Sequence, residues 1–126
     1  MQKRTFHLQA TEYLCVLYVE KSALGPEWES PSPLPLTLTK VEEIARGELR
    51  KLVTDEPRWL VTDFHVGRFQ RSANWYYAVT LKPDVEVAGV EPDSFVALVD
   101  FSGKPGRIAR LNRPAANKHS QELPAR

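Results

Sequence analysis

The spacing of apolar residues changes at Pro57, and this change constrains the fold more than any other feature of the sequence. Between Val41 and Val53, apolar residues recur three and four positions apart, which lays one apolar stripe along an α-helix. Between Trp59 and Phe101, apolar and polar residues alternate, as they do in strands that bury one face. We therefore expect an α+β fold in which one main helix packs on a curled antiparallel sheet of about four to five strands.

The helix is predicted to begin at Thr39 and to end by about Asp55. Thr39 and Glu42 have the spacing of a capping box, in which the hydroxyl accepts from the amide three residues on and the carboxylate reaches back. Pro57 disfavours helical backbone at the residue before it. Gly47 lies inside the helix, where glycine costs about 1 kcal/mol relative to alanine, so we expect it to mark a close approach of the sheet.

Four later segments have the alternation or the composition of strands, namely residues 59–69, 75–82, 95–101 and 108–111. In the first of them, strict alternation places Asp63 and His65 on the same face as Trp59. Gly67 interrupts that segment and predicts a bulge or a bend. An earlier apolar run at residues 13–20 is interpreted as a buried strand, with an amphipathic helix as the open alternative.

Length and composition indicate one domain. A chain of 126 residues, of which 42% are hydrophobic, can bury one ordinary core and not two. We expect the domain at residues 1–113 and a disordered basic tail at residues 114–126. Residues 25–38 form a proline-rich arm, interpreted as a spacer or as a segment that docks on a partner or on the domain itself.

Cys15 is the only cysteine, so it has no disulfide partner within the chain and is expected to be a small buried residue.

Three segments carry a family resemblance: Val-Glu-Glu-Ile-Ala-Arg, Trp-Tyr-Tyr-Ala-Val and Val-Asp-Phe-Ser-Gly-Lys, at residues 41–46, 75–79 and 99–104. Together they make residues 39–111 resemble a PepSY-type domain of the cystatin-like group. The resemblance implies a sheet that wraps around one helix and a noncatalytic binding or inhibitory module, commonly outside the cytoplasm. It also implies a role in the closing turn for Asp100, Gly103 and Lys104, and it implies no active site.

Five residues of the predicted sheet are candidates for a binding site: Trp59, Asp63, His65, Trp75 and Tyr77. Asp63 and His65 lie two positions apart on one strand, so both side chains point to the same face, as an acid-oriented imidazole requires. A surface or rim ion pair is the favoured interpretation of these two residues, and catalysis or metal binding is the alternative. Aromatic residues at strand spacing are typical of core packing, and they can also line a pocket between helix and sheet.

Basic residues are concentrated near the end of the chain, at Lys104, Arg107, Arg110 and Arg113. Such a segment can contact phosphates, but a solvated segment is the favoured interpretation because the tail lacks aromatic residues that would stack on bases. The net charge is only +1, so the molecule as a whole does not attract nucleic acid. We expect no metal site and no cofactor, since three scattered histidines and one cysteine lack the spacing of metal ligands.

The sequence favours a noncatalytic binding or interaction module for a protein or peptide partner. One alternative is an enzyme or small-ligand-binding domain that uses Asp63 and His65, although the sequence has no phosphate loop, nucleophile elbow or paired-cysteine motif. Another is a nucleic-acid-associated protein that uses the basic tail. No apolar stretch has the length of a membrane span, and a homodimer remains open. A cytoplasmic location is expected, with export as the alternative, because the basic start precedes an interrupted apolar run.

Overall fold

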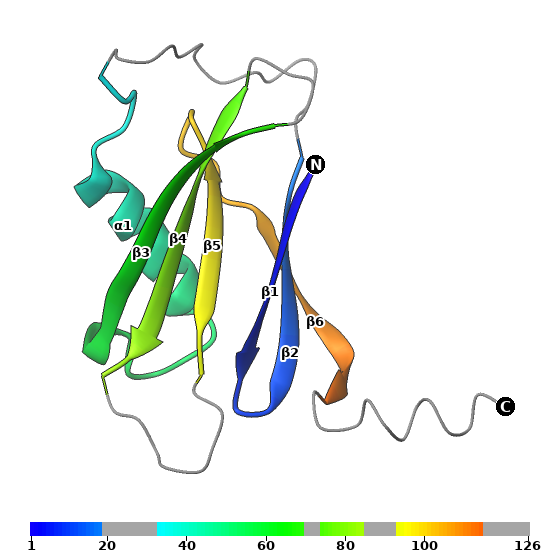
Figure 1. The fold of residues 1–126 in the computed structure, drawn as a ribbon. Helices are drawn as coiled ribbons and strands as arrows, with labels where there is room; N and C mark the ends of the chain where they lie inside the picture. The colour runs from blue at the N-terminus through cyan, green and yellow to red at the C-terminus, as the bar shows by residue number, and fades with distance from the viewer. Residues whose placement is uncertain (19–32, 70–73, 85–92, 115–126) are drawn as a thin grey trace, which may run out of the picture.

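The computed structural model describes residues 1–18, 33–69, 74–84 and 93–114. Residues 112–114 are described by their backbone alone. These residues form one α-helix and two antiparallel sheets of three strands each (Figure 1). The strands of sheet A lie in the order β1 (Gln2–Leu8), β2 (Thr11–Leu17) and β6 (Arg107–Pro114). Those of sheet B lie in the order β3 (Trp59–Arg68), β4 (Trp75–Pro83) and β5 (Phe95–Asp100). The helix α1 spans Leu38–Leu49, and the short 3-10 helix η1 spans Glu56–Arg58.

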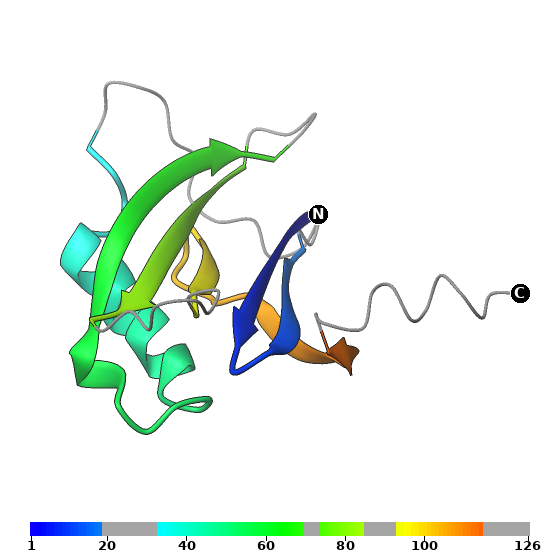
Figure 2. The same ribbon diagram turned by 60° about the horizontal axis from the view of Figure 1, so that its bottom comes forward.

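The helix and both sheets share one core. α1 packs against β4 and β5, and β5 also contacts β1 and β2. Two views show α1 on one side of sheet B, with the β1–β2 hairpin lying beyond β5 (Figure 1 and Figure 2). The cluster of buried apolar side chains draws on all three parts, as shown by Phe6, Cys15, Val41, Tyr77 and Leu98. Within the described ranges, no helix is long and apolar enough to cross a membrane.

The α+β class is confirmed, whereas the prediction of a single curled sheet of four to five strands is wrong. β5 and β6 meet only at the closed end of their hairpin, where Val99 bridges Pro105. The Gly106 amide then donates to the Leu98 carbonyl (2.7 Å). Pro105 has no N–H with which to continue that ladder. Beyond it, β6 leaves β5 and pairs with β2, which creates the second sheet.

The strand predicted at residues 13–20 is present as β2, so the helical alternative is wrong. Its hairpin partner β1 does not follow from the sequence analysis, for two reasons. Arg4 interrupts the apolar alternation of Phe6 and Leu8. The hairpin turn is formed by Gln9 and Ala10, which have φ angles of 51° and 66°. Two-residue turns with positive φ usually contain asparagine or glycine, so this turn has no recognisable sequence signal.

The N-cap of α1 lies two residues before the predicted one. Its N-cap is Thr37, whose hydroxyl oxygen accepts from the Lys40 amide (3.1 Å), so the predicted capping box of Thr39 and Glu42 is wrong. Both threonines have the chemistry of an N-cap. Thr37 is selected because it follows Leu36, which packs against the core in the position of a hydrophobic staple.

The helix also ends earlier than predicted, at Leu49 rather than near Asp55. The amides of Leu52 and Val53 both donate to the Leu49 carbonyl, which forms a turn and keeps these apolar residues against the core. The expectation that Gly47 marks a close approach of the sheet is wrong. A Cβ added to Gly47 would meet no atom within 4 Å.

A bulge in β3 changes which residues share a face. Before it, Val61 lies opposite Leu81, and after it, Asp63 lies opposite Thr80. Residues directly opposite each other in an antiparallel pair have their side chains on the same face. Because Leu81 and Thr80 are neighbours on β4, Asp63 and Val61 point to opposite faces. The prediction that Asp63 shares a face with Trp59 is therefore wrong.

Gly67 lies in the regular part of β3, so the predicted bulge or bend at this residue is not there. It pairs with Tyr76, whose ring covers it. A Cβ at residue 67 would lie 2.5 Å from Cζ of that ring. The ring is also held by an edge contact with Phe69, at a centroid distance of 5.2 Å. The place of the tyrosine ring therefore requires glycine at this position.

A buried carboxylate joins α1 to the start of β3. Glu56 accepts hydrogen bonds from Arg50 Nε (2.7 Å) and Arg46 Nη1 (3.0 Å). Arg46 also donates to the backbone carbonyls of Glu56 (3.1 Å) and Trp59 (2.9 Å). The hydrogen bond from Arg50 is the largest influence on the carboxyl, and together the two guanidinium groups hold the pKa of Glu56 below its ordinary value although burial opposes them. The helix is thus fixed to the sheet by ionic contacts as well as by apolar packing.

The described end of the proline-rich arm lies on the domain itself. Residues 25–32 lie outside the described residues, as do residues 115–126 of the predicted tail. Leu34 and Leu36 pack against the core. The Tyr77 hydroxyl donates to the Leu36 carbonyl (3.2 Å) and accepts from the Leu36 amide (3.2 Å). The segment before α1 is therefore attached to sheet B.

Removing the Tyr77 hydroxyl is expected to loosen this attachment. Tyr77→Phe leaves the partly buried amide and carbonyl of Leu36 without this partner, which should lower the free energy of unfolding by about 1 kcal/mol. Urea unfolding measures this loss. Tyr18→Phe is the matched control, because 62% of Tyr18 is exposed, and it should leave stability unchanged. Equal effects of the two changes would contradict the assigned role of Tyr77.

Candidate functional site

The structure divides the five predicted binding residues between the two faces of sheet B. Trp59 and Tyr77 are buried on the face that carries α1, and Trp75 is partly buried beside them on the same face of β4. Asp63 and His65 are exposed on the opposite face. The structure therefore does not bring the five residues together in one site.

Asp63 and His65 share a face of β3, as their spacing predicts. No ion pair forms between these two described side chains, so the favoured interpretation of a surface ion pair is wrong. The His65 ring instead lies near the ring of Tyr76, at a centroid distance of 6.3 Å. Both side chains are exposed to water on the surface of the sheet.

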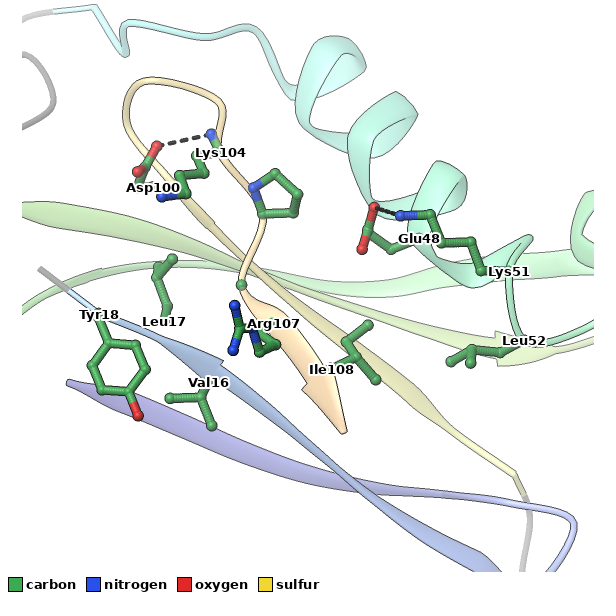
Figure 3. A pocket seen from close by; sticks show the side chains of 12 residues that line it. Val16, Leu17, Tyr18, Glu48, Lys51, Leu52, Asp100, Lys104, Arg107 and Ile108 are labelled. Carbon is green, nitrogen blue, oxygen red and sulfur yellow. Dashed lines mark hydrogen bonds and ion pairs between the residues drawn. The ribbon is translucent and has the colours of Figure 1, made fainter. Parts of the chain in front are cut away.

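A groove lies where the end of β2, the start of β6 and the end of α1 meet (Figure 3). It has a volume of about 590 Å³. Its walls come from residues 16–18, from residues 48, 51 and 52, and from residues 100 and 104–108. We call it the β2–β6 groove. Three segments that are far apart in the sequence thus form one hollow surface.

The turn between β5 and β6 is held by one carboxylate. Asp100 Oδ1 accepts from the Ser102 amide (2.9 Å), the Ser102 hydroxyl (2.6 Å) and the Lys104 amide (2.9 Å). Gly103 has a φ of 98°, which favours glycine. At the end of the turn, a Cβ on Gly106 would lie 2.8 Å from the Val16 carbonyl oxygen. Glycine at residue 106 therefore lets β6 approach β2 closely enough to form the wall of the groove.

The groove combines an apolar floor with charged walls. Leu17 is buried, and Leu52 and Ile108 are partly buried against the core. Among the charged lining residues, Lys51 Nζ pairs with Glu48 (2.9 Å). Figure 3 shows this pair on one side of the groove. An apolar segment that carries a few polar groups can therefore be accommodated there.

Arg107 and Tyr18 are the exposed side chains of the opposite wall (Figure 3). Arg107 forms no ion pair with any residue that the structure describes. An exposed aromatic ring beside a cation is a combination often found at protein interfaces. Both side chains are therefore accessible to a partner.

Cys15 lies beneath the groove and does not contribute a reactive group. It is buried, and a Cβ at Gly106 would lie 3.1 Å from its sulfur atom. Burial raises the pKa of the Cys15 thiol, so the thiol stays protonated near neutral pH. The sulfur is therefore part of the packing under the β2–β6 contact.

Of the four basic residues singled out in the sequence, Lys104 and Arg107 line the groove and Arg110 is exposed on β6. The side chain of Arg113 lies outside the described part of the structure. Other residues that line the groove, such as Tyr18 and Lys51, are not predicted from the sequence as site residues. No spacing rule connects them, because they meet only through the pairing of β2 with β6.

Comparisons of the chain with protein-family models, with curated proteins and with solved structures find no match. In the described part of the chain, no group of three or more histidine, cysteine, aspartate and glutamate side chains is placed to hold a metal ion. The geometry of the β2–β6 groove is therefore the main guide to function.

Proposed function

We propose that the domain is a noncatalytic binding module that holds a segment of a protein or peptide partner in the β2–β6 groove. The observation that carries this proposal is the groove itself, with its volume of about 590 Å³. Ligand-binding clefts commonly have volumes of about 300–1,000 Å³. An apolar floor provides affinity through burial, and charged walls select the orientation and the chemistry of the partner.

The proposed resemblance of residues 39–111 to a PepSY-type, cystatin-like domain points to the same class of function. Along the chain, α1 is followed by the antiparallel strands β3, β4 and β5, an order of elements that is compatible with this resemblance. That resemblance implies binding or inhibition without catalysis. The proposal of a cystatin-like arrangement is thus limited to sheet B and its helix, and sheet A adds the groove.

The alternatives have less support from the described residues. An enzyme that uses Asp63 and His65 would need a sheltered site around them, whereas both are exposed on an open strand face. A nucleic-acid-binding surface would use Arg107 and Arg110, but the groove beside them also contains Glu48 and Asp100. Carboxylates repel a phosphodiester backbone, which carries a negative charge at every nucleotide, whereas a peptide can place its side chains so that no carboxylate lies beside these two residues.

Selection from a display library of random peptides of about ten residues tests the proposal, since that length is sufficient to form a strand. Peptides selected on the full chain should bind the Tyr18→Ala variant about tenfold more weakly, because an exposed tyrosine at an interface commonly contributes that much. Leu60→Ala is the matched control, as this large apolar residue is 53% exposed on β3, outside the groove. Fluorescence anisotropy measures both affinities. Selected peptides that bind the wild type and Tyr18→Ala equally well would overturn the proposal.

A further inference from the structure

β6 is an edge strand. Within the described residues, it pairs with β2 on one side and with no strand along its other side after the bridge at Pro105. An open edge presents unpaired backbone N–H and C=O groups, which can pair with an extended chain. Figure 1 shows β6 on the outer side of sheet A.

The charge of β6 distinguishes between possible partners. Its sequence, Arg-Ile-Ala-Arg-Leu-Asn-Arg-Pro, has three arginines and no acidic residue. Arg107 and Arg110 are exposed, and neither forms an ion pair with a residue that the structure describes. Arg107 pairs with Val16 and Arg110 with Tyr13, so the two cations lie on opposite faces of the edge at which a further strand would pair.

A second copy of this chain fits the edge poorly. Antiparallel pairing of two β6 strands would bring the arginines of one copy beside those of the other, and like charges on neighbouring strands destabilise the pairing. A strand that carries carboxylates converts the same contacts into attraction. The charge of β6 therefore disfavours self-association and favours an acidic partner strand.

The β2–β6 groove accounts for the other half of the recognition. Side chains of an added strand alternate between its two faces, so every second one can point into the groove. Apolar side chains there would contact the floor formed by Leu17, Leu52 and Ile108. Arg107 lies both on the edge strand and on the wall of the groove. One extended peptide can thus use the strand edge and the groove at once.

We infer that an extended peptide segment with acidic and apolar residues adds to the open edge of β6 as a fourth strand of sheet A. Its carboxylates lie beside Arg107, and its apolar side chains, on the other face of the added strand, lie beside Ile108 and reach the floor of the β2–β6 groove. This inference rests on the proposed binding function and specifies both the chemistry of the partner and the way it binds. Affinity comes from main-chain hydrogen bonds and apolar burial, and selectivity comes from Arg107.

The probe for this inference is a peptide of about seven residues, the length of a typical strand, that alternates glutamate and valine and has blocked ends. Titration of the nitrogen-15-labelled full chain should shift the amide signals of β6, with the largest changes in residues 107–111. A peptide that alternates lysine and valine should bind about tenfold more weakly or worse at low salt, as measured by the same amide shifts. Alternate amides of a strand point to the same edge, so two N-methylated forms of the acidic peptide are tested, one for each edge. The form that is methylated on the edge facing β6 should no longer shift the β6 amide signals.

Arg107→Glu provides the decisive variant, because an exposed residue without an ion pair among the described residues can be changed without loss of the fold. This variant should bind the acidic peptide about tenfold more weakly than the wild type does, and it should bind the lysine–valine peptide more tightly. Lys82→Glu makes the same charge change at an exposed position on β4 and should alter neither affinity. Salt should weaken the binding of the acidic peptide to the wild type.

Three results would overturn strand addition. These are shifts that avoid β6, binding of both N-methylated forms, and tighter binding of a thymidine homopolymer than of the acidic peptide. Library-selected peptides that depend on Tyr18 but leave the β6 amides unchanged would also overturn it, while the proposed binding function would stand. If the selected peptides do not depend on Tyr18 and the acidic peptide does not bind, both the inference and the proposed function fail.

Discussion

Replacing Glu56 with glutamine is expected to lower the free energy of unfolding by about 3 kcal/mol, because it removes the charge that compensates two guanidinium groups at the junction of α1 and β3. Arg46 is mostly buried, so it would lose a charged partner in a place where water cannot fully replace it. Chemical unfolding followed by circular dichroism measures the change. Glu42→Gln is the matched control, since Glu42 pairs with the same arginine but is 38% exposed, and its loss should be below about 0.5 kcal/mol.

The pH dependence of unfolding provides a second test of this junction. The pKa of Glu56 is lower in the folded chain than in the unfolded chain, chiefly through the hydrogen bond from Arg50. A carboxyl of this kind stabilises the fold above its unfolded pKa, and the stabilisation is lost as the pH falls towards the folded value. The difference in stability between wild type and Glu56→Gln should therefore be constant near neutral pH and shrink below about pH 4. A difference that grows with acidity would contradict the direction of the shift.

Replacing Gly106 with alanine is expected to lower the free energy of unfolding by about 2–3 kcal/mol and to separate β6 from β2. The added methyl group would lie 2.8 Å from the Val16 carbonyl oxygen and 3.1 Å from the Cys15 sulfur. The first of these is backbone within a paired strand, so it cannot move without disturbing the pairing. Hydrogen exchange should show lost protection in β6 before any loss in sheet B.

Gly47→Ala is the control for a glycine replacement without a clash. No atom lies within 4 Å of the added methyl group, and alanine is favoured over glycine inside a helix, so stability should rise by about 1 kcal/mol. The two glycine replacements are thus expected to have opposite signs. A neutral Gly106→Ala would show that the close approach of β6 to β2 is not as described, and destabilisation by Gly47→Ala would contradict the open space around residue 47.

The elements of sheet B and its helix are largely predictable from the sequence, because their signals are local. The change of apolar spacing at Pro57 separates α1 from β3, and aromatic alternation marks β4. The exact ends are less predictable. Thr37 and Thr39 are both good N-caps, and only the packing of Leu36 in the folded protein decides between them.

Sheet A is not predictable in the same way, because its pairing depends on contacts between distant parts of the chain. The sequence predicts a buried strand at residues 13–20, but nothing in residues 107–114 identifies β2 as their partner. The bulge between Val61 and Asp63 also has no recognisable signal in the sequence. It moves the side chain of every later residue of β3 to the face opposite the predicted one. The β2–β6 groove depends on sheet A, whereas the five binding residues that the sequence predicts all lie on sheet B.

The pairing of β2 with β6 has a consequence for how the protein is made. While a ribosome is still synthesising the middle of the chain, the β1–β2 hairpin has already emerged, but the strand that completes its sheet does not yet exist. A two-stranded hairpin is at best marginally stable in water. Helix α1 and the strands of sheet B can assemble from neighbouring segments, whereas β1 and β2 must wait for nearly the last described residues before they acquire their final neighbours.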